Sequence, residues 1–125
     1  MNMYQENILE HSRNPSNYGV LDKFTHSVFD SNPLCGDEVS IQLLVDSGII
    51  KKVAFSSVGC VISRAGSSII TEFVIGKSVD DIKKMSKEDM LGILNVELSA
   101  SRIKCALLGF VALKKSLWGV SDVAD

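Results

Sequence analysis

The chain carries three cysteines and one nearby aspartate whose types and positions suit metal and sulfur chemistry. Cys35 and Asp37 lie two residues apart in a polar, glycine-containing segment. Cys60 follows a glycine before one predicted helix, and Cys105 lies in the predicted first turn of another, where unpaired N–H groups favour an anion. Thiolates bind soft metals and attack sulfur, and a carboxylate adds an oxygen ligand. Three thiolates and one carboxylate fill a tetrahedral Zn²⁺ shell, and the same set can hold an iron–sulfur cluster.

Three alternatives compete with a shared site, because the cysteine spacing matches no compact zinc-finger pattern. Cysteines are often buried as small hydrophobic residues, and this applies most to Cys105, which has apolar neighbours. A zinc ion can also serve only to stabilise a fold. A cysteine-nucleophile enzyme would need a partner base, yet the two histidines, His11 and His26, lie in segments that look neither catalytic nor metal-binding.

Composition and charge narrow the function classes. The 125 residues are 46% hydrophobic and 22% charged, which is ordinary for a globular protein and enough for one core. The formal charge of −2 and the absence of a lysine or arginine block give no reason to expect nucleic-acid binding. We find neither a signal-peptide pattern nor an apolar run long enough to span a membrane, so we expect a cytoplasmic protein with no membrane partner. An odd number of cysteines also fits a reducing compartment better than a closed set of disulfides.

Hydrophobic periodicity predicts a single domain, residues 1–125, of the α+β class. Strands come first and helices second, which favours helices packed on one face of an antiparallel sheet. The predicted elements are a helix at 3–12, strands at 24–30, 39–45 and 49–56, a helix at 62–74, two short helices starting after Ser78 and Ser86, and a long C-terminal helix from 101 to 118.

Four segments resemble the motifs of IscU/SufU/NifU-N-like iron–sulfur cluster assembly proteins. They are 14–19 (NPSNYG), 32–37 (NPLCGD), 59–63 (GCVIS) and 102–106 (RIKCA). They occur in the order that is typical of this family, and the resemblance extends over residues 4 to 118. Together they make the resemblance specific.

The resemblance implies a three-stranded antiparallel sheet packed by helices, as in SufE/NifU-like folds, with the cysteine site exposed at one end. It implies that Cys35, Asp37, Cys60 and Cys105 bind Zn²⁺ or a transient 2Fe–2S cluster. It also implies two kinds of partner, a pyridoxal-phosphate-dependent cysteine desulfurase that delivers persulfide sulfur and apo iron–sulfur proteins that accept the product. Cys35 is the preferred sulfur acceptor because a Pro-x-Cys-Gly loop can move, and Cys105 is the second candidate catalytic thiol.

Two departures from the family patterns bear on whether the chain is more similar to IscU or to SufU. IscU proper has an LPPVK chaperone-binding motif and a histidine before the third cysteine, whereas here residues 99–104 read SASRIK. Lys104 cannot replace that histidine as a ligand while it is protonated. The RIKCA segment is closer to SufU, yet the insertion that SufU usually carries after the position of Gly76 is missing. The sequence leaves open whether the chain is a scaffold or a zinc-dependent sulfurtransferase.

Overall fold

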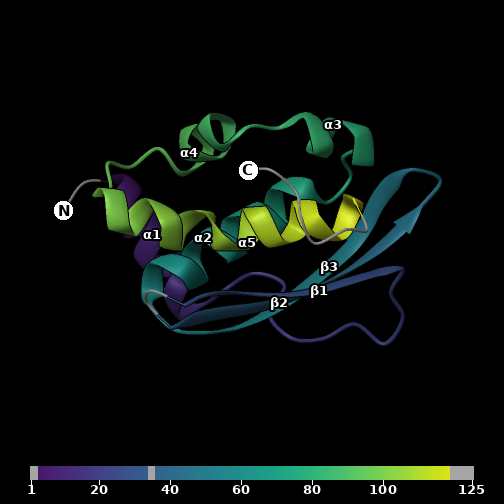
Figure 1. The fold of residues 1–125 in the computed structure, drawn as a ribbon, viewed down its shortest axis with the longest axis horizontal. Coiled ribbons are helices and arrows are strands. Elements are labelled where there is room, and N and C mark those ends of the chain that lie inside the picture. The colour runs from purple at the N-terminus through teal and green to yellow at the C-terminus, as the bar shows by residue number, and fades with distance from the viewer. Residues whose placement is uncertain (1–2, 34–35, 119–125) are drawn as a thin grey trace.

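The structure, a computed structural model, describes residues 3–33 and 36–118 of the chain. In this part of the chain one helix precedes the three strands and four helices follow them (Figure 1). They are α1 (Met3–Arg13), β1 (His26–Asn32), β2 (Asp37–Asp46), β3 (Ile49–Val58), α2 (Val61–Val74), α3 (Val79–Lys84), α4 (Lys87–Leu94) and α5 (Ala100–Trp118).

The three strands form one antiparallel sheet in the order β1-β2-β3, which confirms the predicted α+β class. The β2–β3 hairpin closes through Ser47 and Gly48, with φ angles of 55° and 76°. Two left-handed residues in a two-residue loop are the signature of a type I′ turn, which matches the twist of the flanking strands. Asn32 pairs with Asp37, and Glu38 pairs with Val58. The start of β2 therefore lies beside the end of β3.

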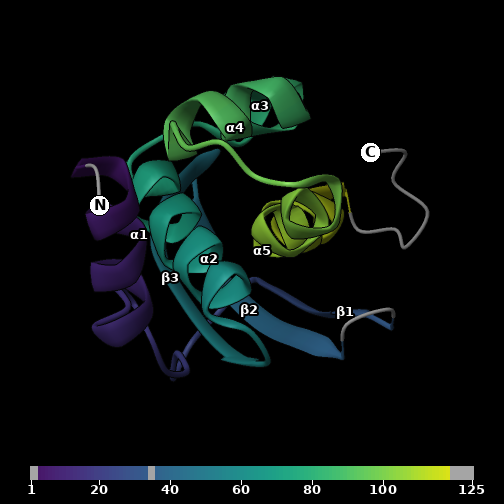
Figure 2. The same ribbon diagram turned by 90° about the vertical axis from the view of Figure 1, so that its left-hand side faces the viewer.

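The helices cover one face of the sheet in two further layers (Figure 2). In this view α2 and α5 lie on the sheet, α1 flanks α2, and α3 with α4 forms a layer over α2 and α5. The core lies mainly between the sheet and these two central helices. Its largest fully buried side chains are Phe55, Phe110, Ile41, Leu43, Ile50, Ile70, Ile82, Met90, Leu94, Leu113, Val39 and Val74.

The two short helices begin at the serines that the sequence indicated. The Ser78 hydroxyl accepts the N–H of Asp81 at 3.1 Å at the start of α3. At the start of α4, Ser86 accepts the N–H of Asp89 at 3.1 Å, and the Asp89 carboxylate accepts the N–H of Ser86 at 2.9 Å. Each such cap stabilises its helix by about 1 kcal/mol.

Two element boundaries differ from the prediction. β1 lies at His26–Asn32 instead of 24–30, because pairing with β2 extends through Asn32 opposite Asp37. Sheet pairing outweighs the turn-forming tendency of the Ser-Asn-Pro segment. Helix α5 begins at Ala100, so Cys105 lies in its second turn and not in its first. Its N–H therefore falls after the four that an α-helix leaves unpaired at its start.

Small residues let α2 and α5 approach each other closely. A Cβ on Gly66 would lie 2.4 Å from the carbonyl oxygen of Ala106, and a Cβ on Gly109 would lie 2.9 Å from Cα of Ser67. Neither position has room for any side chain larger than a hydrogen atom. This contact fixes the start of α2 relative to the second turn of α5.

The NPSNYG loop, residues 14–19, fastens α1 to α2. The Ser68 hydroxyl accepts the N–H of Ser16 at 2.8 Å and lies 2.7 Å from Nδ1 of His11. Asn17 donates from Nδ2 to the Thr71 hydroxyl at 3.3 Å. The loop motif thus has a structural part in this fold, since it supplies the partners of hydroxyl groups on α2.

Candidate metal centre

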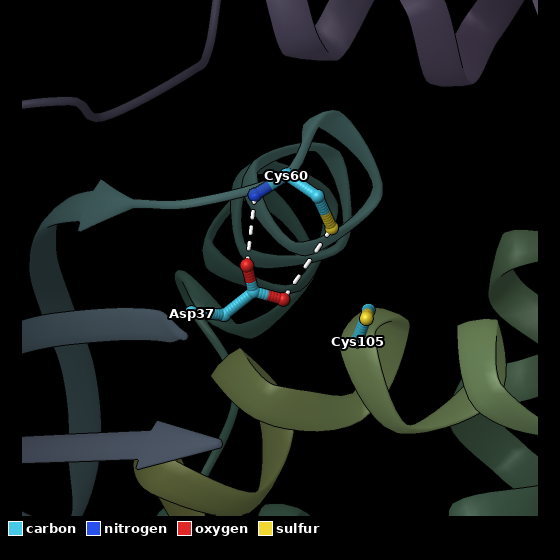
Figure 3. Close-up of side chains that lie close together, drawn as sticks. All are labelled: Asp37, Cys60 and Cys105. Atoms are coloured by element: carbon cyan, nitrogen blue, oxygen red, sulfur yellow. Dashed lines mark hydrogen bonds between the residues drawn. The ribbon is translucent and has the colours of Figure 1, made fainter. Parts of the chain in front are cut away.

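Asp37 and Cys60 come together because β2 begins where β3 ends and α2 begins. Cys60 is the N-cap of α2, with an extended backbone (φ −78°, ψ 162°), and its Sγ accepts the N–H of Ser63 at 3.5 Å. Its own N–H donates to Oδ1 of Asp37 at 2.8 Å, and its thiol donates to Oδ2 at 3.4 Å (Figure 3). Both carboxylate oxygens of Asp37 therefore face Cys60.

Gly59 makes this contact possible. Its φ of +132° lies in the region that residues with a side chain rarely adopt, and a Cβ there would lie 2.0 Å from Oδ1 of Asp37. In the sequence, Gly59 stands out only as part of the GCVIS motif, and the room it leaves for the carboxylate is not predicted. The available signal was a glycine directly before a helix N-cap, opposite an aspartate at the start of a strand.

Cys105, on α5, lies close to Asp37 and Cys60. Figure 3 shows its thiol on the side of α5 that faces Asp37 and Cys60. One ligand atom from each of the three residues lies within 4.8 Å of the other two. Asp37 is 1% exposed and Cys105 6%, whereas Cys60 is half-buried. The described part of the site is therefore more buried than the family resemblance implied.

The donor set fits a soft metal ion. Tetrahedral zinc with Zn–S bonds of about 2.3 Å needs sulfur atoms about 3.8 Å apart, and the ligand atoms here lie within 4.8 Å of one another. The 3.4 Å between Sγ of Cys60 and Oδ2 of Asp37 already matches the separation of two ligands on one ion. Two sulfur atoms and one oxygen leave one position of a tetrahedral shell to fill.

Cys35, the fourth predicted ligand, lies outside the described residues, between Pro33 and Gly36. Its place in the site stays a prediction. The structure brings together the other three predicted residues, Asp37, Cys60 and Cys105, and their role as ligands also stays a prediction.

Both histidines have other contacts. His11 lies between the Ser68 hydroxyl and the Glu72 carboxylate, which is 3.9 Å from its Nε2. His26 bonds through Nδ1 to the hydroxyl of Thr25 at 2.8 Å. Within residues 3–33 and 36–118, neither histidine belongs to the group formed by Asp37, Cys60 and Cys105. In the same residues, no helix combines the length and the apolar character needed to cross a membrane.

Comparisons with known proteins agree with the motifs. The chain matches the family described as the NifU-like N-terminal domain over residues 3–121. It is 33% identical, over 95% of both chains, to the iron–sulfur cluster assembly scaffold protein IscU of Thermotoga maritima. It is 32% identical to the zinc-dependent sulfurtransferase SufU of Bacillus subtilis, over 92% of this chain and 89% of that protein.

A solved structure shows the same fold. The N-terminal part of a NifU-like protein from Brucella abortus superposes with a TM-score of 0.78, covering 98% of this chain and 96% of that one. The two sequences are 21% identical, so this likeness bears on the fold alone.

Proposed function

Since this chain belongs to the NifU-like N-terminal domain family, we propose that it takes part in iron–sulfur cluster assembly. One of its relatives is named a cluster assembly scaffold and another a zinc-dependent sulfurtransferase. Both names refer to sulfur and to a metal. The proposal for this chain is that it accepts sulfur from a persulfide donor and holds either a nascent 2Fe–2S cluster or Zn²⁺.

One observation carries this proposal, namely the convergence of Asp37, Cys60 and Cys105 from three separate elements, with ligand atoms within 4.8 Å of one another. They come from the start of a strand, the cap of a helix and the second turn of another helix. Burying a carboxylate beside two thiols is costly, and the hydrogen bonds from Cys60 to Asp37 offset only part of that cost. Metal binding or sulfur chemistry would account for this arrangement.

The sulfur-transfer step needs a thiolate and an accessible path. A cysteine thiolate of this chain attacks the outer sulfur of the donor persulfide, the donor S–S bond breaks, and the donor cysteine leaves as a thiolate. The acceptor becomes a persulfide, and no external oxidant or reductant is needed. Cys35 is the proposed first acceptor, and Cys105 is the second candidate. Cys105 is 6% exposed, which favours a first acceptor elsewhere.

Asp37 is proposed to make the site labile. Its carboxylate is a hard oxygen ligand among soft sulfur ligands, so it is the one most readily exchanged. The Asp37 carboxylate also accepts the backbone N–H of Cys60 at Oδ1. This hydrogen bond would keep the side chain in place when the metal or cluster leaves.

The residue before Cys105 bears on whether the site binds zinc or a cluster. Lys104 stands where IscU proper has a histidine, and a protonated ammonium donates no lone pair. A bound Zn²⁺ would keep the cysteines deprotonated and release a nucleophile on ligand exchange. This favours the zinc-dependent sulfur-transfer mode, with a cluster as transient cargo in the scaffold mode.

The proposed partners follow from this chemistry. A pyridoxal-phosphate-dependent cysteine desulfurase supplies the persulfide, and apo iron–sulfur proteins take the product. The proposed location is the cytoplasm, where thiols stay reduced.

The test is metal and labile-sulfide analysis of protein purified anaerobically, before and after incubation with a cysteine desulfurase, cysteine and Fe²⁺. Tightly bound zinc with a cysteine persulfide, and no cluster, supports sulfur transfer. Iron and sulfide that appear together and pass to an apo-ferredoxin support a scaffold. Cys60→Ser and Cys105→Ser should each reduce metal content severalfold, whereas Ser101→Ala on the exposed start of α5 should not.

Two results would contradict the proposal. Protein that binds neither metal nor sulfur would rule out both modes. Zinc that resists chelators until the protein unfolds, and thiols inert to the persulfide donor, would leave a purely structural zinc domain.

A further inference from the structure

Two buried polar atoms without a hydrogen-bond partner lie in the first turn of α2, next to the candidate metal centre. Within residues 3–33 and 36–118, the buried side-chain atoms that lack a partner are Oγ of Ser63, Nε of Arg64 and Oγ of Ser67. Ser63 and Arg64 belong to the turn that Cys60 caps. Ser63 is only 1% exposed, so water does not reach its hydroxyl. Leaving a buried hydroxyl unpaired is costly and calls for an explanation.

Ser63 lies on the side of α2 that faces the cysteine-bearing turn of α5. Residues three apart on a helix are neighbours on its surface, so Ser63 lies between Cys60 and Gly66. Cys60 has its sulfur in the same cluster as the Cys105 thiol. Gly66 lies against the next residue of α5, since a Cβ there would be 2.4 Å from the carbonyl oxygen of Ala106. Ser63 is therefore buried between two contacts that α2 makes with this part of α5.

The Ser63 hydroxyl lies within reach of a sulfur atom attached to Cys60. In an α-helix the Cα–Cβ bond leans toward the N-terminus, so the Ser63 side chain leans toward Cys60, the N-cap. The N–H of Ser63 already donates to Sγ of Cys60 at 3.5 Å, and only two carbon atoms join that nitrogen to the hydroxyl oxygen. In a persulfide the outer sulfur lies about 2 Å beyond the inner one. This added length brings a second sulfur on Cys60 toward the hydroxyl.

The start of α2 favours a negatively charged sulfur. The helix dipole is positive at this end, which stabilises anions there. Arg64 adds a positive charge on the same turn, where its guanidinium carbon lies 4.6 Å from the centre of the Tyr18 ring. The Asp37 carboxylate opposes these charges, because its Oδ2 lies 3.4 Å from Sγ of Cys60. A hydrogen bond donated directly to the sulfur offsets part of that repulsion.

We propose that Ser63 is a sulfur-binding residue, whose hydroxyl donates a hydrogen bond to the outer sulfur of a persulfide on Cys60. The inference rests on the proposed function, which brings sulfur to the site. The Cys60 thiolate attacks the outer sulfur of the persulfide on the first acceptor, the S–S bond breaks, and the first acceptor leaves as a thiolate. Cys60 is half-buried and so can be reached. Ser67 lies seven residues from Cys60, about 10 Å along the helix axis, which is too far for this role.

The experiment uses metal-free, full-length protein in which Cys35→Ala and Cys105→Ala leave Cys60 as the single thiol. Sodium tetrasulfide loads it, because the Cys60 thiolate attacks a sulfur of the tetrasulfide, one S–S bond breaks and trisulfide leaves. Mass spectrometry verifies that one sulfur atom has been added. Two properties of the persulfide are then measured, namely its near-ultraviolet absorption band and its rate of alkylation by iodoacetamide.

Ser63→Ala and Ser67→Ala form a matched pair, because each removes one buried hydroxyl that has no partner within residues 3–33 and 36–118. With Ser63→Ala, alkylation of the persulfide should be about tenfold faster, since the attacking lone pair is no longer held by a hydrogen bond. Its absorption band should move to longer wavelength for the same reason. With Ser67→Ala, the rate should change by less than about twofold and the band should not move. Thermal unfolding verifies that both variants are folded.

Three outcomes would overturn the proposal. An unchanged alkylation rate and band with Ser63→Ala would show that the hydroxyl does not bind the sulfur. Equal changes with Ser63→Ala and Ser67→Ala would assign the effect to packing between α2 and α5. Single-thiol protein that gains no sulfur would show that Cys60 carries no persulfide. The proposed function is tested separately, on protein with all three cysteines and a desulfurase, so its failure is distinguishable from each of these results.

Discussion

The backbone of Gly59 passes so close to Asp37 that a Cβ on the glycine would lie 2.0 Å from Oδ1 of the carboxylate and 2.9 Å from the Asp37 Cα. That oxygen is the one that accepts the N–H of Cys60. The glycine therefore does two things at once, since it turns the chain from β3 into α2 and leaves space for a buried carboxylate.

Gly59→Ala should lower the free energy of unfolding by about 2–4 kcal/mol, because it adds both backbone strain and a steric clash. It should also displace Asp37 and weaken zinc binding. Gly48→Ala is the matched control, because Gly48 also has a positive φ (+76°) but no atom within 4 Å of the added Cβ. The control should cost about 1–2 kcal/mol and leave zinc affinity unchanged. Urea unfolding and a zinc-chelator competition measure the two quantities; equal losses in both variants would show that the contact with Asp37 is unimportant.

Asp37→Ala should lengthen the lifetime of a bound metal or cluster, because the most exchangeable ligand is removed. It should also cost about 1–3 kcal/mol of stability, because the N–H of Cys60 loses its acceptor. Asp37→Asn separates the two effects: the amide oxygen can still accept that N–H, but it is a poorer ligand. The rate of transfer to a chelator and the urea midpoint are the measurements, and an unchanged release rate in both variants would contradict the role given to Asp37.

The contact between α2 and α5 can be tested at Gly66. Alanine in a helix is normally favoured over glycine by about 1 kcal/mol. Gly66→Ala should nevertheless destabilise the protein by about 1–3 kcal/mol, because the new Cβ would lie 2.4 Å from the Ala106 carbonyl oxygen. Spreading the two helices should also separate the Cys60 and Cys105 sulfurs and weaken zinc binding.

Gly92→Ala in α4 is the control for that prediction. No atom lies within 4 Å of a Cβ at Gly92, so this substitution should stabilise the protein by about 0.5–1 kcal/mol. A comparable gain at Gly66, seen as a raised midpoint in thermal unfolding, would mean that the close approach of α2 and α5 does not depend on this glycine.

The sequence was a good guide where a local signal decides the structure. The alternation of apolar residues in β2 and the Ser47-Gly48 turn predicted the hairpin, and the serines at 78 and 86 predicted the starts of α3 and α4. Each of these depends on neighbours within a few residues. The family motifs then supplied the cluster of Asp37, Cys60 and Cys105, which no spacing rule would have found.

The sequence was a poorer guide where a distant contact decides the structure. β1 lies two residues later than predicted because its partner strand begins at Asp37. Cys105 lies two residues deeper in its helix than expected, in the second turn and not the first, since α5 begins at Ala100, before the serine predicted as its cap. The close fit of Gly59 against Asp37 depends on packing between elements, which local sequence patterns do not indicate.

Ser68→Ala should be the more damaging of two neighbouring serine substitutions in α2. The Ser68 hydroxyl accepts the N–H of Ser16 and contacts His11, so its removal should cost about 1–3 kcal/mol and loosen α1. The Ser67 hydroxyl is also buried but has no hydrogen-bond partner among residues 3–33 and 36–118. Ser67→Ala should therefore change stability by less than about 0.5 kcal/mol or increase it slightly, because no bond is lost. Urea unfolding gives the two free energies, and faster hydrogen exchange in α1 should accompany Ser68→Ala alone; equal effects at both positions would show that the NPSNYG loop does not depend on this hydroxyl.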